Sequence, residues 1–124
     1  MTSVTETPHS EADRSAPDPF VVWVRGDMDL DHSARLRALI RTAVARAPRG
    51  AEIILDLQNS SFCDSTGLNE LLSGRRRALE SGHPLTLAAP SHQMVRMLEI
   101  TRSIGLFGLC PAVPQEPPAG AARG

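Results

Sequence analysis

A serine and a threonine lie side by side in the run Asp64-Ser65-Thr66-Gly67, just before the apolar positions of a predicted helix. The first N–H groups of a helix have no acceptor within it, and the helix dipole favours negative charge there. The fold would therefore tolerate a phosphate on the Ser65 or Thr66 hydroxyl. Asp64 and Ser65 are also ordinary helix-capping residues. The local pattern alone leaves a capping role and a phosphorylation site both open.

Three aspartates alternate in the string Asp27-x-Asp29-x-Asp31, and His32 follows them. A calcium-binding EF-hand loop would need glycine at its sixth position and glutamate at its twelfth, where this sequence has His32 and Ala38. A two-aspartate phosphatase would need a lysine, and the chain has none. The string is therefore predicted to be a helix-capping and recognition turn, with no metal site.

Cys63 is the other candidate for chemistry, as a nucleophile with His32, His83 or His92 as its base. Nothing in the sequence brings these groups together, so Cys63 is predicted to be a buried small apolar residue, and Cys110 likewise. Two cysteines outside any paired spacing form neither a disulfide framework nor a metal site. A reducing, cytoplasmic compartment is expected.

The composition excludes several classes of function. All 13 basic residues among the 124 are arginines, so a Walker-A phosphate loop or a Schiff-base enzyme cannot be built. A net charge of -1 without an arginine-rich arm argues against nucleic-acid binding. No apolar run approaches the roughly 20 residues of a membrane span, and the N-terminus does not resemble a signal peptide.

The two ends of the chain differ in composition from the rest. Residues 1–18 are rich in serine, threonine, proline and acids, and residues 114–124 are rich in proline, glycine and alanine. Segments of this kind bury too little apolar surface to offset the entropy of ordering. We therefore expect disordered tails at 1–18 and 114–124 around one domain at 19–113.

The elements that would position these residues alternate between strand and helix. Apolar and β-branched runs predict strands at 20–24, 52–57 and 85–89, with a last irregular one within 106–113. Helical spacing of apolar residues predicts helices at 36–47, 68–79 and 94–98, the first capped by Asp31 or Ser33 and the third by Ser91. The expected fold is α/β, a single layer of about four to five strands with helices packed against it.

Two of these motifs together resemble those of STAS domains, of the bacterial anti-sigma factor antagonist kind. The family typically has G-E-hydrophobic-D after an early strand, and here Gly26-Asp27-Met28-Asp29 has aspartate in place of the glutamate. The family's D-S-[ST]-G phosphorylation loop is intact as Asp64-Ser65-Thr66-Gly67. The resemblance covers about residues 19–110. Family members usually have a further strand before Phe20 and a fourth, C-terminal helix, and the sequence departs from the family in both places.

The resemblance implies a partner switch and no enzymatic activity or cofactor. The unphosphorylated antagonist would bind an anti-sigma factor that is also a serine kinase, which frees the sigma factor. Phosphorylation of Ser65, with Thr66 as second choice, would break that complex, and a serine phosphatase would restore it. Asp27, Asp29, Asp64, Thr66 and Gly67 would form the loop and partner-binding surface.

Two other functions remain open at this stage. A STAS scaffold in a larger sensor or transport assembly could use the same face without phosphorylation. A small hydrolase could be built around Asp27, Asp29 and Cys63.

Overall fold

The computed structural model describes residues 17–112. Most of each predicted tail therefore lies outside the described residues, and the tail boundaries stay predictions. The described chain contains four strands and three α-helices, with two short 3-10 helices between them. In chain order the elements are β1 (Phe20–Arg25), η1 (Leu30–His32), α2 (Ser33–Arg46), β2 (Ile53–Asn59), α3 (Ser65–Glu80), β3 (Leu85–Ala88), α4 (His92–Ile100), η2 (Ile104–Leu106) and β4 (Gly108–Cys110).

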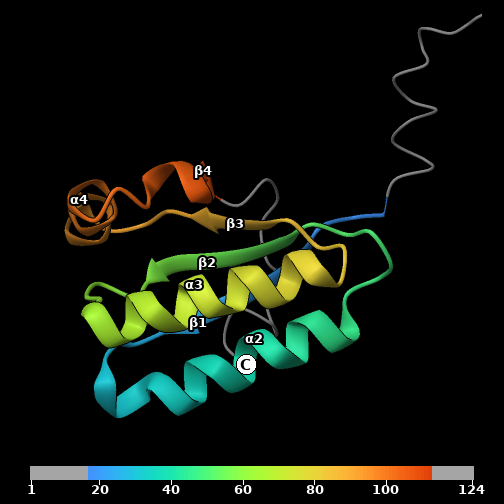
Figure 1. The fold of residues 1–124 in the computed structure, drawn as a ribbon, viewed down its shortest axis with the longest axis horizontal. Helices are drawn as coiled ribbons and strands as arrows, with labels where there is room; N and C mark the ends of the chain where they lie inside the picture. Colours follow the sequence, from blue (N-terminus) through green and yellow to red (C-terminus); the bar gives the residue numbers. More distant parts are fainter. Residues whose placement is uncertain (1–16, 113–124) are drawn as a thin grey trace, which may run out of the picture.

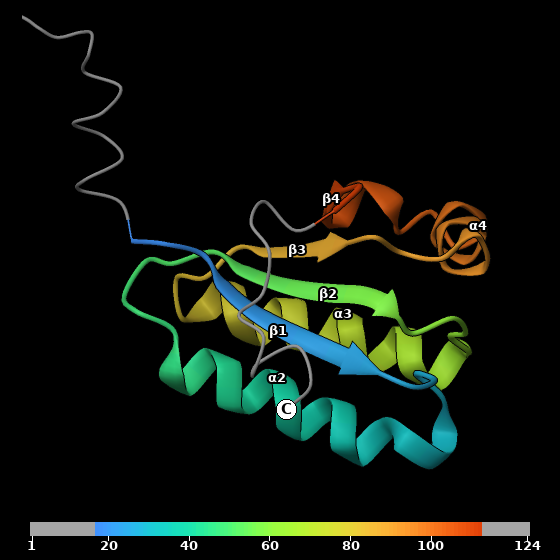
Figure 2. The ribbon, with the colours of Figure 1, turned by 180° about the vertical axis from the view of Figure 1, so that it is seen from behind.

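The four strands form one parallel sheet in the order β1-β2-β3-β4. Helices α2 and α3 lie side by side on one face of it, in front of the strands in Figure 1 and behind them in Figure 2. Because all strands run the same way, the loops that follow β1, β2 and β3 emerge at one end of the sheet. Helix α4 lies at that same end (Figure 1). The predicted α/β single layer is confirmed.

The core lies between the sheet and the two helices α2 and α3. Strand β2 contributes Ile53, Leu55 and Leu57, each about 1% exposed or less. The two helices approach closely at Gly74 of α3, where an added Cβ would lie 2.7 Å from the Cδ1 atom of Ile40. A larger residue at this position would force the Ile40 side chain to shift and would disturb the packing of α2 on α3.

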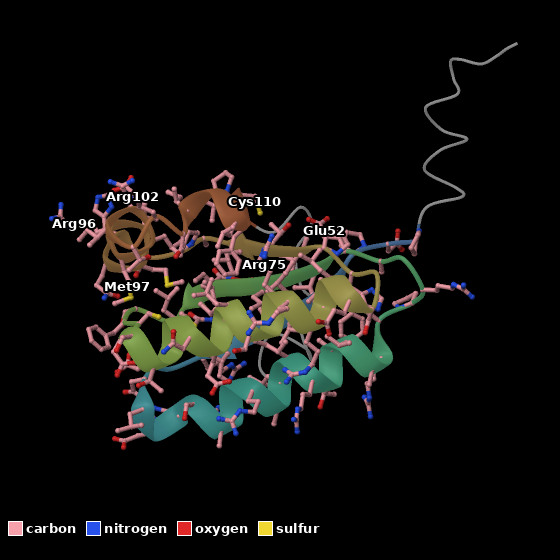
Figure 3. All side chains as sticks on the ribbon, viewed as in Figure 1. Glu52, Arg75, Arg96, Met97, Arg102 and Cys110 are labelled. Atoms are coloured by element: carbon pink, nitrogen blue, oxygen red, sulfur yellow. The ribbon has the colours of Figure 1, made fainter. Side chains whose placement is uncertain are left out.

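The segment between α4 and β4 is held to α3 by one arginine of the Arg75-Arg76-Arg77 run. The Arg75 Nε–H donates to the Leu106 carbonyl at 2.6 Å. Figure 3 shows Arg75 on α3, and it shows Met97 on the side of α4 that faces α3 whereas Arg96 points outward. The segment after α4 is thus tied to α3 by a hydrogen bond, and Met97 of α4 packs against the hydrophobic core.

One predicted helix cap is wrong. Neither Asp31 nor Ser33 caps α2; its N-cap is His32, which makes no side-chain cap bond. The chain first forms η1, and Asp29 caps that turn by accepting from the His32 N–H at 3.1 Å. The predicted cap of α4 is confirmed, since the Ser91 hydroxyl accepts from the Met94 N–H at 3.1 Å.

Candidate functional site

The two sequence motifs meet at the end of the sheet where β1 and β2 finish. The Met28 N–H donates to the Phe62 carbonyl at 2.9 Å, and the Asp64 N–H donates to the Met28 carbonyl at 3.0 Å. Met28 and Cys63 form an isolated parallel bridge, which extends the pairing of β1 with β2 beyond the regular strands. The turn after β1 and the loop after β2 therefore form one hydrogen-bonded unit.

Asp64 is central to this unit because its carboxylate accepts hydrogen bonds from both segments. One oxygen, Oδ1, accepts from the Gly67 N–H at 2.9 Å and caps α3. The other, Oδ2, accepts from the Leu30 N–H at 3.3 Å. The predicted capping role of Asp64 is confirmed, and the carboxylate is fixed directly beside Ser65.

Gly67 is required by a close approach of backbone to backbone. A Cβ at this position would lie 2.0 Å from the Met28 carbonyl oxygen, far inside any contact that real Cβ atoms make. The helix is right-handed and regular here, so the need for glycine comes from space and not from a left-handed conformation. Gly67 thus permits α3 to begin directly against the turn after β1.

Ser65 and Thr66 differ in their accessibility. Ser65 is the first residue of α3 and is exposed, whereas Thr66 is half-buried. The N–H groups of both residues belong to the first turn of the helix, where no intrahelical acceptor exists. A hydroxyl acceptor for phosphate is therefore more accessible at Ser65 than at Thr66.

The aspartates of the first motif do not converge on a common centre. The Asp29 carboxylate accepts from the His32 N–H and lies 2.6 Å from His32 Nδ1. Asp27 is half-buried, and Asp31 is exposed. Within residues 17–112, no three histidine, cysteine or acidic residues are grouped so that they could hold a metal ion.

The Cys63 environment does not suit a nucleophile. Its side chain is fully buried, and burial, with a smaller contribution from the nearby Asp64 charge, raises the pKa of the thiol to about 12. His83 is buried elsewhere, with Nδ1 2.8 Å from the Ala51 carbonyl, and His32 is paired with Asp29. The prediction that Cys63 is a buried apolar residue is confirmed, whereas the same prediction is wrong for Cys110, which is only half-buried.

A residue that the sequence reasoning missed, Gln93, holds the loop from the side of α4. Its Oε1 accepts from the Cys63 N–H at 2.8 Å, and its Nε2 donates to the Cys63 carbonyl at 2.7 Å. Thirty positions separate the two residues along the chain. Local spacing contains no signal for such a contact, which follows from the placement of α4 beside the loop.

A family model described as "Mlab, STAS domain" matches residues 11–107, which include both motifs. The match spans more than half of the chain, and the protein belongs to the STAS domain family. In the part of the chain that the structure describes, no helix is long and apolar enough to cross a membrane.

Solved structures share the fold. A protein described as an anti-sigma factor antagonist, from Thermotoga maritima, has a TM-score of 0.65 at 16% identity, over 75% of this chain and 80% of that one. A sulfate transporter family protein from Wolinella succinogenes has a TM-score of 0.64 at 18% identity, over 76% and 77%. The anti-sigma factor antagonist SpoIIAA in its unphosphorylated form is 26% identical, with a TM-score of 0.51, over 83% and 84%.

Proposed function

We propose that this protein is an anti-sigma factor antagonist that is switched by phosphorylation of Ser65. In this proposal the unphosphorylated form binds an anti-sigma factor with serine kinase activity and thereby frees a sigma factor. The kinase then phosphorylates Ser65, the complex dissociates, and a serine phosphatase restores the binding form. The similarity to SpoIIAA and the intact Asp64-Ser65-Thr66-Gly67 loop support this proposal.

The observation that carries the proposal is the setting of Ser65. Ser65 is an exposed first residue of α3, it directly follows a loop whose backbone is bonded to the turn after β1, and the residue before it, Asp64, has its carboxylate fixed by the helix cap. A phosphate here changes the charge of a preformed surface without entering the core. The expected consequence is a lost interface on a preserved fold.

The electrostatic energies expected for a phosphate on Ser65 agree with a lost interface on a preserved fold. Phosphoserine adds about -1.5 to -2 charges. At about 5 Å and an effective dielectric of 20 to 80, each pair of unit charges repels by about 1 to 3 kcal/mol. The amino terminus of α3 offsets about 0.3 to 2 kcal/mol of this repulsion in the free protein. In a complex the phosphate would also lose water against the partner, which weakens binding more than it weakens the fold.

The test begins with the intact mass of the protein purified from its own cells. A fraction heavier by one phosphate, mapped to Ser65, is expected. Purified candidate kinases should then label the wild type and Thr66→Ala but leave Ser65→Ala unlabelled and still bound, while Ser65→Asp should bind weakly. Equal labelling of Ser65→Ala and the wild type would contradict the assignment of Ser65.

A scaffold role without phosphorylation is the second candidate, because the same fold occurs in a sulfate transporter family protein. The two functions differ in one measurement. A scaffold would carry no phosphate under any growth condition, and it would bind its partner equally well as the wild type and as Ser65→Asp. The hydrolase alternative has less support, because the thiol that it would use is buried with a raised pKa.

A further inference from the structure

Two large apolar side chains are exposed beside the Ser65 loop. Leu30 is 69% exposed in the turn after β1, and Phe62 is 43% exposed in the loop after β2. Single exposed apolar residues are common on protein surfaces and need no explanation. This pair differs because both residues belong to the hydrogen-bonded unit that positions Ser65.

Hydrogen bonds made by the backbone groups of Leu30 and Phe62 fix both residues relative to Ser65. The Leu30 N–H donates to the carboxylate of Asp64, the residue before Ser65. The Phe62 carbonyl accepts from the Met28 N–H, and Phe62 itself is three positions before Ser65. The two side chains are therefore presented on a preorganised surface, which lowers the entropy lost when a partner covers them.

The charge around these side chains restricts what can cover them. The two loops are also acidic, because Asp29 and Asp31 flank Leu30 in the sequence and Asp64 lies two positions after Phe62. A second copy of this chain in a symmetric contact would bring these carboxylates together, and an anionic lipid surface would repel them. A protein with apolar pockets and basic groups at their rim fits this surface.

We infer that Leu30 and Phe62 are apolar anchors through which the kinase partner docks on the Ser65 loop. This inference rests on the proposed function and adds two residues to the partner-binding surface that the motifs define. Apolar anchors in the centre of an interface, with charges at the rim, carry most of the binding energy in protein complexes. Docking through them also brings the exposed Ser65 hydroxyl within the same contact, where a phosphate would be deprived of water.

The experiment compares Leu30→Ala and Phe62→Ala with the control Leu79→Ala. Leu79 is as exposed as Phe62, at 43%, and lies near the other end of α3, about 20 Å along the helix from Ser65. The probe is the purified kinase that phosphorylates the wild-type chain, with binding measured by calorimetry in the absence of ATP. Each anchor variant should bind about 10- to 100-fold more weakly, and Leu79→Ala should stay within about twofold of the wild type.

Phosphorylation kinetics provide a second readout that altered folding would not mimic. The KM for each anchor variant should rise by a similar factor while kcat stays near the wild-type value, because the reacting hydroxyl is unchanged. Thermal unfolding should change little for Leu30→Ala, where the residue is 69% exposed, and somewhat more for Phe62→Ala, where it is 43% exposed. Anchor variants that bind and react like the wild type would overturn the inference and leave the proposed function standing.

Two further outcomes overturn the inference in distinguishable ways. If no kinase labels Ser65 of the wild type, the proposed function fails and the inference fails with it. If light scattering shows a dimer of the wild type that Leu30→Ala and Phe62→Ala dissociate, the two side chains serve a contact between copies of this chain.

Discussion

The side-chain amide of Gln93 pairs with both backbone polar groups of Cys63, at 2.8 Å to its N–H and 2.7 Å to its carbonyl. An extended peptide backbone would make the same pair of bonds, so Gln93 acts as a one-residue substitute for a neighbouring strand. Through it, α4 holds the loop between β2 and α3 in place. The loop that carries Ser65 is thus fixed from the β1 side by Met28 and from the α4 side by Gln93.

Replacing Gln93 with alanine should therefore loosen the loop. The variant leaves the N–H and carbonyl of the buried Cys63 without their partners, which should lower the free energy of unfolding by about 1 to 3 kcal/mol in urea denaturation. Hydrogen exchange at the Cys63 amide should accelerate as well. His92→Ala, an exposed neighbour on α4, is the control, and a Gln93→Ala protein as stable as His92→Ala would contradict this role.

Gly67→Ala should disrupt the junction of the two motifs. Its methyl group would overlap the Met28 carbonyl oxygen, so the start of α3 and the turn after β1 must separate. We expect a loss of about 1 to 3 kcal/mol or more in the free energy of unfolding. Gly105→Ala is the matched control, because an added Cβ there meets nothing within 4 Å. Equal stability of the two variants would show that the junction does not need glycine.

Asp64 offers a test that separates its hydrogen bonds from its charge. Asp64→Ala removes the cap of α3 and the acceptor for Leu30, and should lower the free energy of unfolding by about 0.5 to 2 kcal/mol. Asp64→Asn keeps an acceptor oxygen for the cap and should recover much of that loss, since asparagine caps helices about as well as aspartate. Thermal and urea unfolding of both variants provide the measurement. If Asp64→Asn were as unstable as Asp64→Ala, the charge and not the cap would be the stabilising element.

The buried thiol of Cys63 should be inert in the folded protein. Burial raises the pKa of this thiol to about 12 from an ordinary value of 9.0. Cys110, by contrast, is only half-buried and is therefore more accessible to reagents. Treatment with iodoacetamide at pH 8 should modify Cys110 first, with Cys63 reacting only in urea, as read by mass spectrometry. Rapid labelling of Cys63 in the native protein would contradict its burial.

The same raised pKa predicts a direction for stability at alkaline pH. Because the folded pKa of Cys63 lies above the unfolded one, its contribution is fully present below pH of about 9, where the thiol is protonated in both states. As the pH rises from about 9 toward 12, the unfolded chain ionises first and stability declines. Cys63→Ala should show a smaller decline over that range, and an identical one would count against the raised pKa.

The sequence by itself determined the alternation of strand and helix, the Ser91 and Asp64 caps and the two motifs. These features depend on side-chain periodicity or on bonds between residues three positions apart, which the order of residues specifies directly. The predicted cap of α2 is wrong for a related reason. Asp29 caps a 3-10 turn that comes before α2, and the apolar spacing that predicts the helix begins only after that turn.

Only the tertiary structure decided how the two motifs are joined. The parallel pairing of β1 with β2 brings the Met28 carbonyl against Gly67, and the path of the chain through β3 brings Gln93 to Cys63. The burial of Cys63 and the exposure of Leu30 and Phe62 likewise follow from which faces the neighbouring elements cover. Contacts between residues some thirty positions or more apart depend on the packing of whole elements, and local sequence patterns do not encode that packing.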